Sequence, residues 1–318
     1  YIAETENLNF TTDQEPKSPE NYKSFIFIHF LEGALLAVDS LKKLGFHISL
    51  SVIDEPEDTT AFKKILQKEE MKHIDIFIGP FFQNNAFILA QHLKKRNIKG
   101  TPKYMFPPLI FNNSIIQNNP YVVKTTPSVD LQLTQLAAFL KKDSTQHNII
   151  IVYRKDQNEM HFANILKEQL KSSSPASYTV KDIIWSAAGG NIPNLQKNIV
   201  QGKQNKLIVL SNNEVLVSTL TRELETHCNP DNVTLFGLPN WIEMDILEPY
   251  ILQRFNTHLF NASYINYKRD DVKDFIQKFS YNYHTIPDKY GFKGFDLVCL
   301  STKNYNTTDK TLSLPTNM

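Results

Sequence analysis

Apolar residues recur along the chain with two alternating periods, one typical of helices and one typical of strands. Between residues 24 and 44, Phe30, Ala34, Val38 and Leu41 follow one another every three or four residues, which predicts an amphipathic helix ending before Gly45. Residues 47–53 then alternate and are rich in β-branched side chains, which predicts a strand. Similar patterns predict further strands at 74–78, 104–110, 148–153, 178–185, 206–211 and 233–237. They predict further helices at 60–71, 84–96, 126–141, 159–170, 194–202, 214–226 and 271–283.

This alternation of helices and strands predicts an α/β fold. Strands that alternate with helices form right-handed crossovers and parallel sheets. The strands are too numerous for one compact sheet, so we expect two doubly wound parallel-sheet lobes joined by a hinge, with crossings near 124–127 and 255–266. The expected boundaries are 1–125 for lobe 1, 126–255 for lobe 2, and 256–318 for a segment returning to lobe 1. The helix at 126–141 is expected to have Thr126 as its N-cap.

Composition excludes several classes of protein. The 318 residues carry 34 Lys and Arg against 33 Asp and Glu, a net charge of +1, which argues against a nucleic-acid partner. No apolar run approaches the roughly 20 residues that span a bilayer, so we expect no membrane insertion of this chain. Cys228 and Cys299 lie too far apart in sequence for a CxxC site.

Catalytic and cofactor motifs are missing from the sequence. It contains no GxGxxG or GxxxxGK[ST] loop, no GxSxG elbow and no HExxH pair, and its nine His are scattered. We therefore expect no enzyme, no metal and no cofactor. Asp54, Glu55, Glu57 and Asp58 could together hold a cation, but Pro56 among them favours a solvated turn.

Small polar residues follow four of the predicted strands. In open α/β sheets, ligands bind outside the carboxyl ends of parallel strands, and helix N-termini there suit anions. Asn and Ser are also common N-caps, so each group has a purely structural alternative. The candidate ligand-binding residues are Gln83, Asn84, Asn112, Asn113, Ser114, Asp156, Asn158, Asn212, Asn213, Glu214 and Trp241.

Two of these candidates have specific alternatives. Glu214 either holds a ligand ammonium group or complements the dipole of the helix that it begins. Trp241 either walls a ligand pocket or packs in the core or the hinge.

Several motifs, taken in order, resemble a known family, the type I periplasmic binding proteins, and most closely their leucine/isoleucine/valine-binding-like branch. The stretches 25–41 and 236–241 also resemble modules that follow LysM repeats in bacterial envelope proteins. The motifs are Gly33-Ala34-Leu35-Leu36-Ala37-Val38-Asp39, Ile76-Phe77-Ile78-Gly79-Pro80, Val123-Lys124-Thr125-Thr126-Pro127-Ser128 with Gln132, and Phe275, Phe279, Tyr283 and Pro287 followed by Gly294-Phe295-Asp296.

The resemblance implies a non-enzymatic protein of the periplasm or cell envelope whose two lobes close on a small polar ligand. In the family that ligand is usually an amino acid, and its carboxylate meets groups after the third and fourth strands, here Gln83-Asn84 and 112–114. A cell-wall fragment is a second expected ligand class. The implied partners are a membrane permease or peptidoglycan, through modules outside this chain.

Departures from the family pattern keep a second interpretation open. The family's Ser after "GP" is absent, Ile110-Phe111 replaces a small polar residue, and an expected aromatic position falls near Asn158. No segment before Ser24 has the pattern of the family's first strand, and the tail after Leu300 does not have the pattern of its closing elements. We therefore expect either a chain truncated at both ends or one whose missing strand is supplied otherwise. The alternative is a ligand-free scaffold of the same fold that serves cell-wall association or protein contacts.

Overall fold

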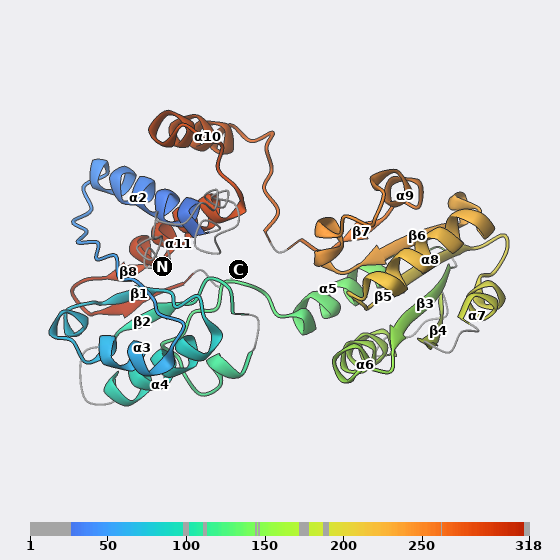
Figure 1. The fold of residues 1–318 in the computed structure, drawn as a ribbon, viewed down its shortest axis with the longest axis horizontal. Coiled ribbons are helices and arrows are strands. Elements are labelled where there is room, and N and C mark those ends of the chain that lie inside the picture. Colours follow the sequence, from blue (N-terminus) through green and yellow to red (C-terminus); the bar gives the residue numbers. More distant parts are fainter. Residues whose placement is uncertain are drawn as a thin grey trace, which may run out of the picture. The chain divides into compact units, whose positions relative to one another are not determined.

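The computed structural model describes residues 27–97, 102–110, 113–143, 145, 147–171, 178–186, 191–261 and 263–314. The chain divides into two compact units (Figure 1). Unit 1 comprises residues 1–126 and 263–318, and unit 2 comprises residues 127–262. The chain therefore passes between the units twice, at 126–127 and at 262–263.

Unit 2 is built on a five-stranded parallel sheet with the order β4-β3-β5-β6-β7. β3 pairs with β4 on one side and with β5 on the other, and every residue from His147 to Tyr153 is buried. Strands covered on both faces are expected to be nearly continuous apolar runs, as the predicted strand at 148–153 is after Asn148. The strands are β3 (His147–Arg154), β4 (Tyr178–Trp185), β5 (Gln204–Val209), β6 (Val233–Gly237) and β7 (His258–Leu259).

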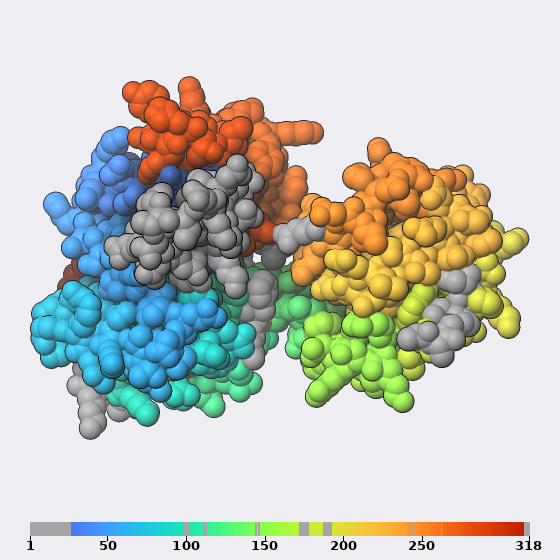
Figure 2. All heavy atoms as spheres, in the orientation of Figure 1, coloured from blue at the N-terminus to red at the C-terminus, as the bar shows by residue number. Residues whose placement is uncertain are grey.

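Helices cover both faces of this sheet. α5 and α6 pack against each other, as α7 and α8 do, which follows from right-handed crossovers to either side of β3. Ser128, rather than the predicted Thr126, caps α5, because its hydroxyl accepts the N–H of Leu131. In Figure 2, α8 and α9 (yellow to orange) form much of the visible surface of unit 2. The helices are α5 (Val129–Lys142), α6 (Gln157–Lys171), α7 (Asn191–Asn198), α8 (Glu214–His227) and α9 (Pro249–Arg254), with 3-10 turns η5 (Pro230–Asn232) and η6 (Pro239–Glu243).

Unit 1 has three layers around a short parallel sheet in which β1 pairs with β2. Ile78 packs with α2 and α11 on one face, and Phe77 and Met105 pack with α3 and α4 on the other. This alternation is the period of a strand with two covered faces. The elements are α2 (Ile28–Lys43), α3 (Thr59–Leu66), η3 (Glu69–Lys72), β1 (Ile76–Ile78), α4 (Gln83–Asn97), β2 (Tyr104–Phe106), η4 (Asn113–Ile116), α10 (Asp270–Tyr283), α11 (Lys289–Lys303), and a hairpin of β8 (Tyr305–Asn306) and β9 (Thr311–Leu312).

Glycines allow α2 and α11 to approach closely. A Cβ atom on Gly33 would lie 1.9 Å from the carbonyl oxygen of Gly291, and one on Gly294 would lie 2.0 Å from that of Phe30. The two motifs that contain Gly33 and Gly294 therefore face each other although they are far apart in sequence.

The predicted strand at 47–53 is wrong, because these residues join no sheet in the structure. The alternation does describe their packing: Ile48 packs against the cluster of α2 and α11, and Ile53 against that of α3 and α4. A strand also needs a hydrogen-bonding neighbour. Within the described residues β1 pairs with β2 alone, so the segment has the strand pattern without a partner.

None of the helices in the described ranges combines the length and the apolarity needed to cross a membrane.

Candidate functional site

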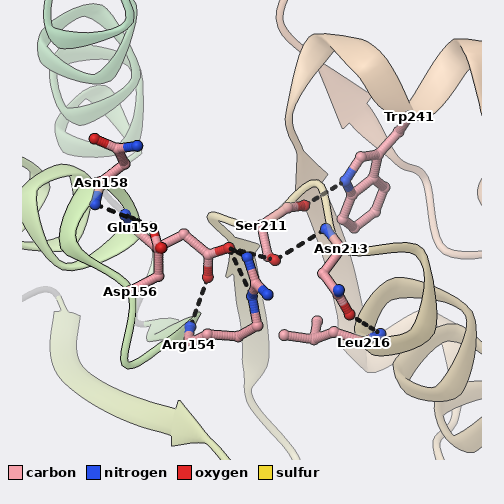
Figure 3. A network of polar contacts seen from close by, with 8 residues as sticks. All are labelled: Arg154, Asp156, Asn158, Glu159, Ser211, Asn213, Leu216 and Trp241. Atoms are coloured by element: carbon pink, nitrogen blue, oxygen red, sulfur yellow. Dashed lines mark hydrogen bonds and ion pairs between the residues drawn. The ribbon is translucent and has the colours of Figure 1, made fainter.

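A polar network lies at the carboxyl edge of the sheet of unit 2 (Figure 3). β3 ends at Arg154, and the loop after β5 carries Ser211. Because β3 and β5 are parallel neighbours, these residues meet at the same edge of the sheet. Glu159, in the first turn of α6, connects them.

The Glu159 carboxylate is the centre of the network. Its Oε2 accepts the backbone N–H of Arg154 at 2.6 Å, and its Oε1 accepts Nε and Nη2 of the Arg154 guanidinium at 2.9 and 2.6 Å. The hydroxyl of Ser211 donates to the same Oε1 at 2.7 Å. The side chain of Glu159 is only 7% exposed. A buried carboxylate is tolerated when it is paired and hydrogen-bonded, as this one is.

The Arg154 side chain contacts this buried carboxylate and is itself partly exposed to solvent. Its side chain is 39% exposed, and its Nη1 takes no part in the contacts with Glu159. The hydrogen bonds from the guanidinium to Glu159 raise the pKa of Arg154 above its usual value. The guanidinium is thus fixed in orientation while part of it remains open. A guanidinium that is held in one orientation with N–H groups open to solvent suits a carboxylate or another planar oxyanion.

Ser211 links the network to Trp241. The backbone carbonyl of Ser211 accepts the indole N–H of Trp241 at 2.9 Å, and its hydroxyl accepts the N–H of Asn213 at 3.1 Å. Trp241 is 1% exposed and packs on Gly237, where a Cβ would lie 2.5 Å from its ring. The structure therefore gives Trp241 a packing position beneath the edge of the sheet.

The other candidates in unit 2 lie at helix starts. Asp156 accepts the N–H groups of Asn158 and Glu159, and Asn213 accepts the N–H of Leu216 as the N-cap of α8. The side chains of these two residues therefore occupy helix N-termini themselves. Asn158, Asn212 and Glu214 are exposed, and Glu214 lies in the first turn of α8.

The candidates in unit 1 do not form a comparable network among the described residues. Gln83 and Asn84 are exposed in the first turn of α4. Asn113 accepts a hydrogen bond from Nζ of Lys124 at 2.9 Å, and Ser114 lies beside it in η4. Asn112 lies outside the described residues.

The Glu55 carboxylate makes hydrogen bonds within unit 1, whereas the sequence led us to expect a solvated turn at this position. Its carboxylate accepts the N–H groups of Phe81 and Phe82, at 2.7 and 3.2 Å, and the side-chain amide of Asn85 at 3.0 Å. Burial raises the pKa of Glu55 above its usual value, and these hydrogen bonds oppose the shift. Asp58, in the same acidic cluster, caps α3 through the N–H of Ala61. The N-terminus of α4 is thus satisfied by a carboxylate of the protein.

The sequence interpretation missed Arg154, Glu159 and the inward position of Glu55, and the candidate ligand-binding residues did not include Ser211. Each has a weak signal in hindsight, since each lies within a few residues of the end of a predicted strand. Glu55 and Glu159 are charged residues beside apolar segments. Phe81 lies 26 positions from Glu55 and Ser211 lies 52 positions from Glu159, whereas Arg154 is only five positions from Glu159.

Metal ligation has no support in the described ranges, where no three His, Cys, Asp or Glu side chains gather in a way that would hold an ion.

No protein-family model and no curated protein sequence matches the chain. Solved structures are similar over most of its length. An ABC transporter substrate-binding protein from Desulfitobacterium hafniense in complex with Leu is 16% identical, with a TM-score of 0.58 over 89% of this chain and 80% of that one. A putative branched-chain amino acid ABC transporter protein from Rhodospirillum rubrum is 12% identical, with a TM-score of 0.63 over 87% and 78%. The chain therefore has the type I periplasmic binding fold, as the sequence motifs predicted.

Proposed function

We propose that the protein is a non-enzymatic binding module that holds a small, amino-acid-like ligand through a carboxylate. The observation that carries this proposal is the guanidinium of Arg154 at the carboxyl edge of the sheet of unit 2. It is oriented by a buried carboxylate and is still partly open.

The network favours binding over catalysis. Glu159 already accepts four hydrogen bonds, from the backbone and side chain of Arg154 and from Ser211, so it is not poised as a general base. The hydroxyl of Ser211 donates to Glu159 and has no histidine partner among the residues that the structure describes, unlike an activated nucleophile. What the network supplies is a cation in a fixed orientation.

Amino acids are the first ligands to test. The similar structures from Desulfitobacterium hafniense and Streptococcus pneumoniae were solved in complex with leucine and isoleucine. A single guanidinium fork matches the α-carboxylate that all amino acids carry. With this ligand class we place the protein in the periplasm or cell envelope, with a membrane permease as its partner. An association with LysM modules and peptidoglycan remains a prediction from the sequence.

The experiment is a thermal-shift screen of the purified chain against amino acids, their amides and their decarboxylated amines. A true ligand at one hundred times its Kd adds about 2.7 kcal/mol to the free energy of unfolding. We expect stabilisation by at least one amino acid and none by its amide. If no carboxylate in the panel raises Tm, the proposal fails.

The ligand-free scaffold is the second candidate. It is favoured by the self-capped N-termini of α4, α6 and α8, where Glu55, Asp156 and Asn213 hold N–H groups that an anion would otherwise take. It predicts no stabilisation by any small molecule in the screen. It also predicts that Arg154→Ala behaves in the screen as the parent chain does.

A further inference from the structure

The 47–53 segment of unit 1 has the pattern of a strand but pairs with no other strand. None of its backbone N–H or C=O groups takes part in a hydrogen bond within the described part of the chain. Ile48 and Ile53 pack against helices of unit 1, whereas Leu50 is 40% exposed and Val52 is 63% exposed. An extended segment with open peptide groups and exposed apolar side chains is a template for pairing with another chain.

Apolar and polar side chains of this segment are sorted onto opposite faces. Side chains alternate between the two faces of an extended chain. The even-numbered residues from Phe46 to Val52 are all apolar, and the odd-numbered residues from His47 to Ser51 are all polar. Two such segments that pair side by side can therefore bring all their apolar side chains onto one face.

Antiparallel pairing about a two-fold axis gives each of these apolar residues an apolar partner. With Ser49 opposite Ser49 of the second copy, Ile48 lies opposite Leu50 of that copy, and Phe46 lies opposite its Val52. Directly opposed residues of antiparallel strands share a face, so these pairs form one continuous apolar strip. The segment is therefore complementary to itself.

The charges at the two ends of the segment favour the antiparallel arrangement. Lys42 and Lys43 are exposed at the end of α2, just before the segment, and Asp54 and Glu57 follow it. In an antiparallel pair the basic end of one copy lies beside the acidic end of the other. In a parallel pair like charges would meet, which is unfavourable.

The open edge of the sheet in unit 2 is protected in a way that the 47–53 segment is not. β4 is the outer strand of that sheet and carries Lys181 and Asp182 at its centre. A two-fold axis through the middle of β4 would set one of these charges against its own copy. Charged residues on an edge strand commonly prevent such pairing. The sequence from His47 to Ile53 contains no Asp, Glu, Lys or Arg.

We propose that the 47–53 segment is a dimerisation surface and that its partner is a second copy of this chain, paired antiparallel in the register centred on Ser49. This goes beyond the proposed function, because the surface uses residues of unit 1 alone and needs no ligand at Arg154. The partner supplies hydrogen bonds to the open peptide groups and covers the exposed side chains of Leu50 and Val52.

Sedimentation equilibrium of the full chain, over a range of concentrations and without ligand, tests the dimer. We expect a monomer–dimer equilibrium. Leu50→Lys should raise the dimer Kd at least tenfold, because the two-fold axis makes it disrupt two apolar pairs at once. Val52→Lys changes a more exposed residue and is the second variant, should Leu50→Lys fold poorly by circular dichroism. Ile286→Lys, at a 71% exposed position of unit 1 outside the segment, is the control and should keep the parent Kd.

Disulfide trapping tests the register. Under mild oxidation Ser49→Cys should give a covalent dimer, because directly opposed Cβ atoms lie about 4.5–5.5 Å apart, close to the span of a disulfide. Ser51→Cys is the matched control, since the same register places its Cβ about 14 Å from that of its copy, at about 3.4 Å per residue. The parent chain, whose Cys228 and Cys299 are half-buried, gives the background.

Three results would overturn the proposal. A monomer at every concentration would mean that solvent or residues of the same chain cover the segment. A dimer that neither lysine variant weakens would place the contact elsewhere on the molecule. Equal trapping at Ser49→Cys and Ser51→Cys would exclude the register. None of these results bears on binding at Arg154, which the ligand screen judges separately.

Discussion

Removal of the Glu159 carboxylate is expected to destabilise unit 2 severely. Glu159→Ala deletes the acceptor of four hydrogen bonds, three from Arg154 and one from Ser211. The backbone N–H of Arg154 and the hydroxyl of Ser211 then lose their partner at the edge of a buried sheet. Breaking a buried ion pair by deleting one member costs about 3–5 kcal/mol, mostly because the remaining groups are left uncompensated.

Smaller changes to the same network give graded effects. Glu159→Gln keeps the shape and one acceptor but loses the charge, so we expect a loss of about 1–3 kcal/mol. Ser211→Ala removes one neutral donor and is expected to cost about 1 kcal/mol. Since Glu159 and Ser211 are in direct contact, the double variant should cost less than the sum of the two single variants.

Urea unfolding followed by tryptophan fluorescence measures these losses selectively. Both tryptophans of the chain, Trp185 and Trp241, lie in unit 2, and Trp241 is hydrogen-bonded to Ser211. The surface control is Glu168→Ala on the same helix, whose carboxylate is 70% exposed and pairs with Lys171; it should cost well under 1 kcal/mol. If Glu159→Ala costs no more than this control, the network is not the structural centre of the site.

Three further predictions test other parts of the structure. Gly294→Ala places a Cβ 2.0 Å from the carbonyl oxygen of Phe30, so it should push α11 from α2 and lower the stability of unit 1 by about 1–3 kcal/mol in chemical unfolding. Glu55→Ala should accelerate hydrogen exchange of the Phe81 and Phe82 amides, whereas Glu57→Ala should not. Because burial lowers the pKa of Lys293, on α11, to about 8, the unfolded state binds its proton more tightly; stability should therefore rise between pH 8 and about pH 10.5, and Lys293→Met should lack that contribution.

Local patterns predicted most helices and strands and hence the fold class. β4 and β6 lie at the predicted residues, and β3 extends one residue beyond the prediction at each end. β3 and β6 are mostly apolar, and β4 is rich in β-branched and aromatic residues, so local sequence is enough to identify them. The segment 47–53 has an equally clear pattern and forms no strand, because pairing depends on a neighbour that the pattern does not encode.

The site was harder to predict than the fold. The polar residues after the strands were predicted as a group of ligand contacts, but Asp156 and Asn213 accept N–H groups at the starts of their own helices. Glu159 and Ser211 are 52 residues apart and meet only because β3 and β5 are neighbours. A strand order of β4-β3-β5 cannot be deduced from the order of elements along the chain, so the network could not have been assembled from the sequence.

Calorimetric titration of the purified chain with leucine, in parallel with Arg154→Ala and Lys155→Ala, tests the central claim most directly. Lys155 is the exposed neighbouring cation and provides the matched control. The account predicts saturable binding to the parent chain that survives Lys155→Ala and falls at least tenfold in Arg154→Ala. Equal affinity of all three proteins, or no heat of binding from leucine or any other amino acid, would contradict it.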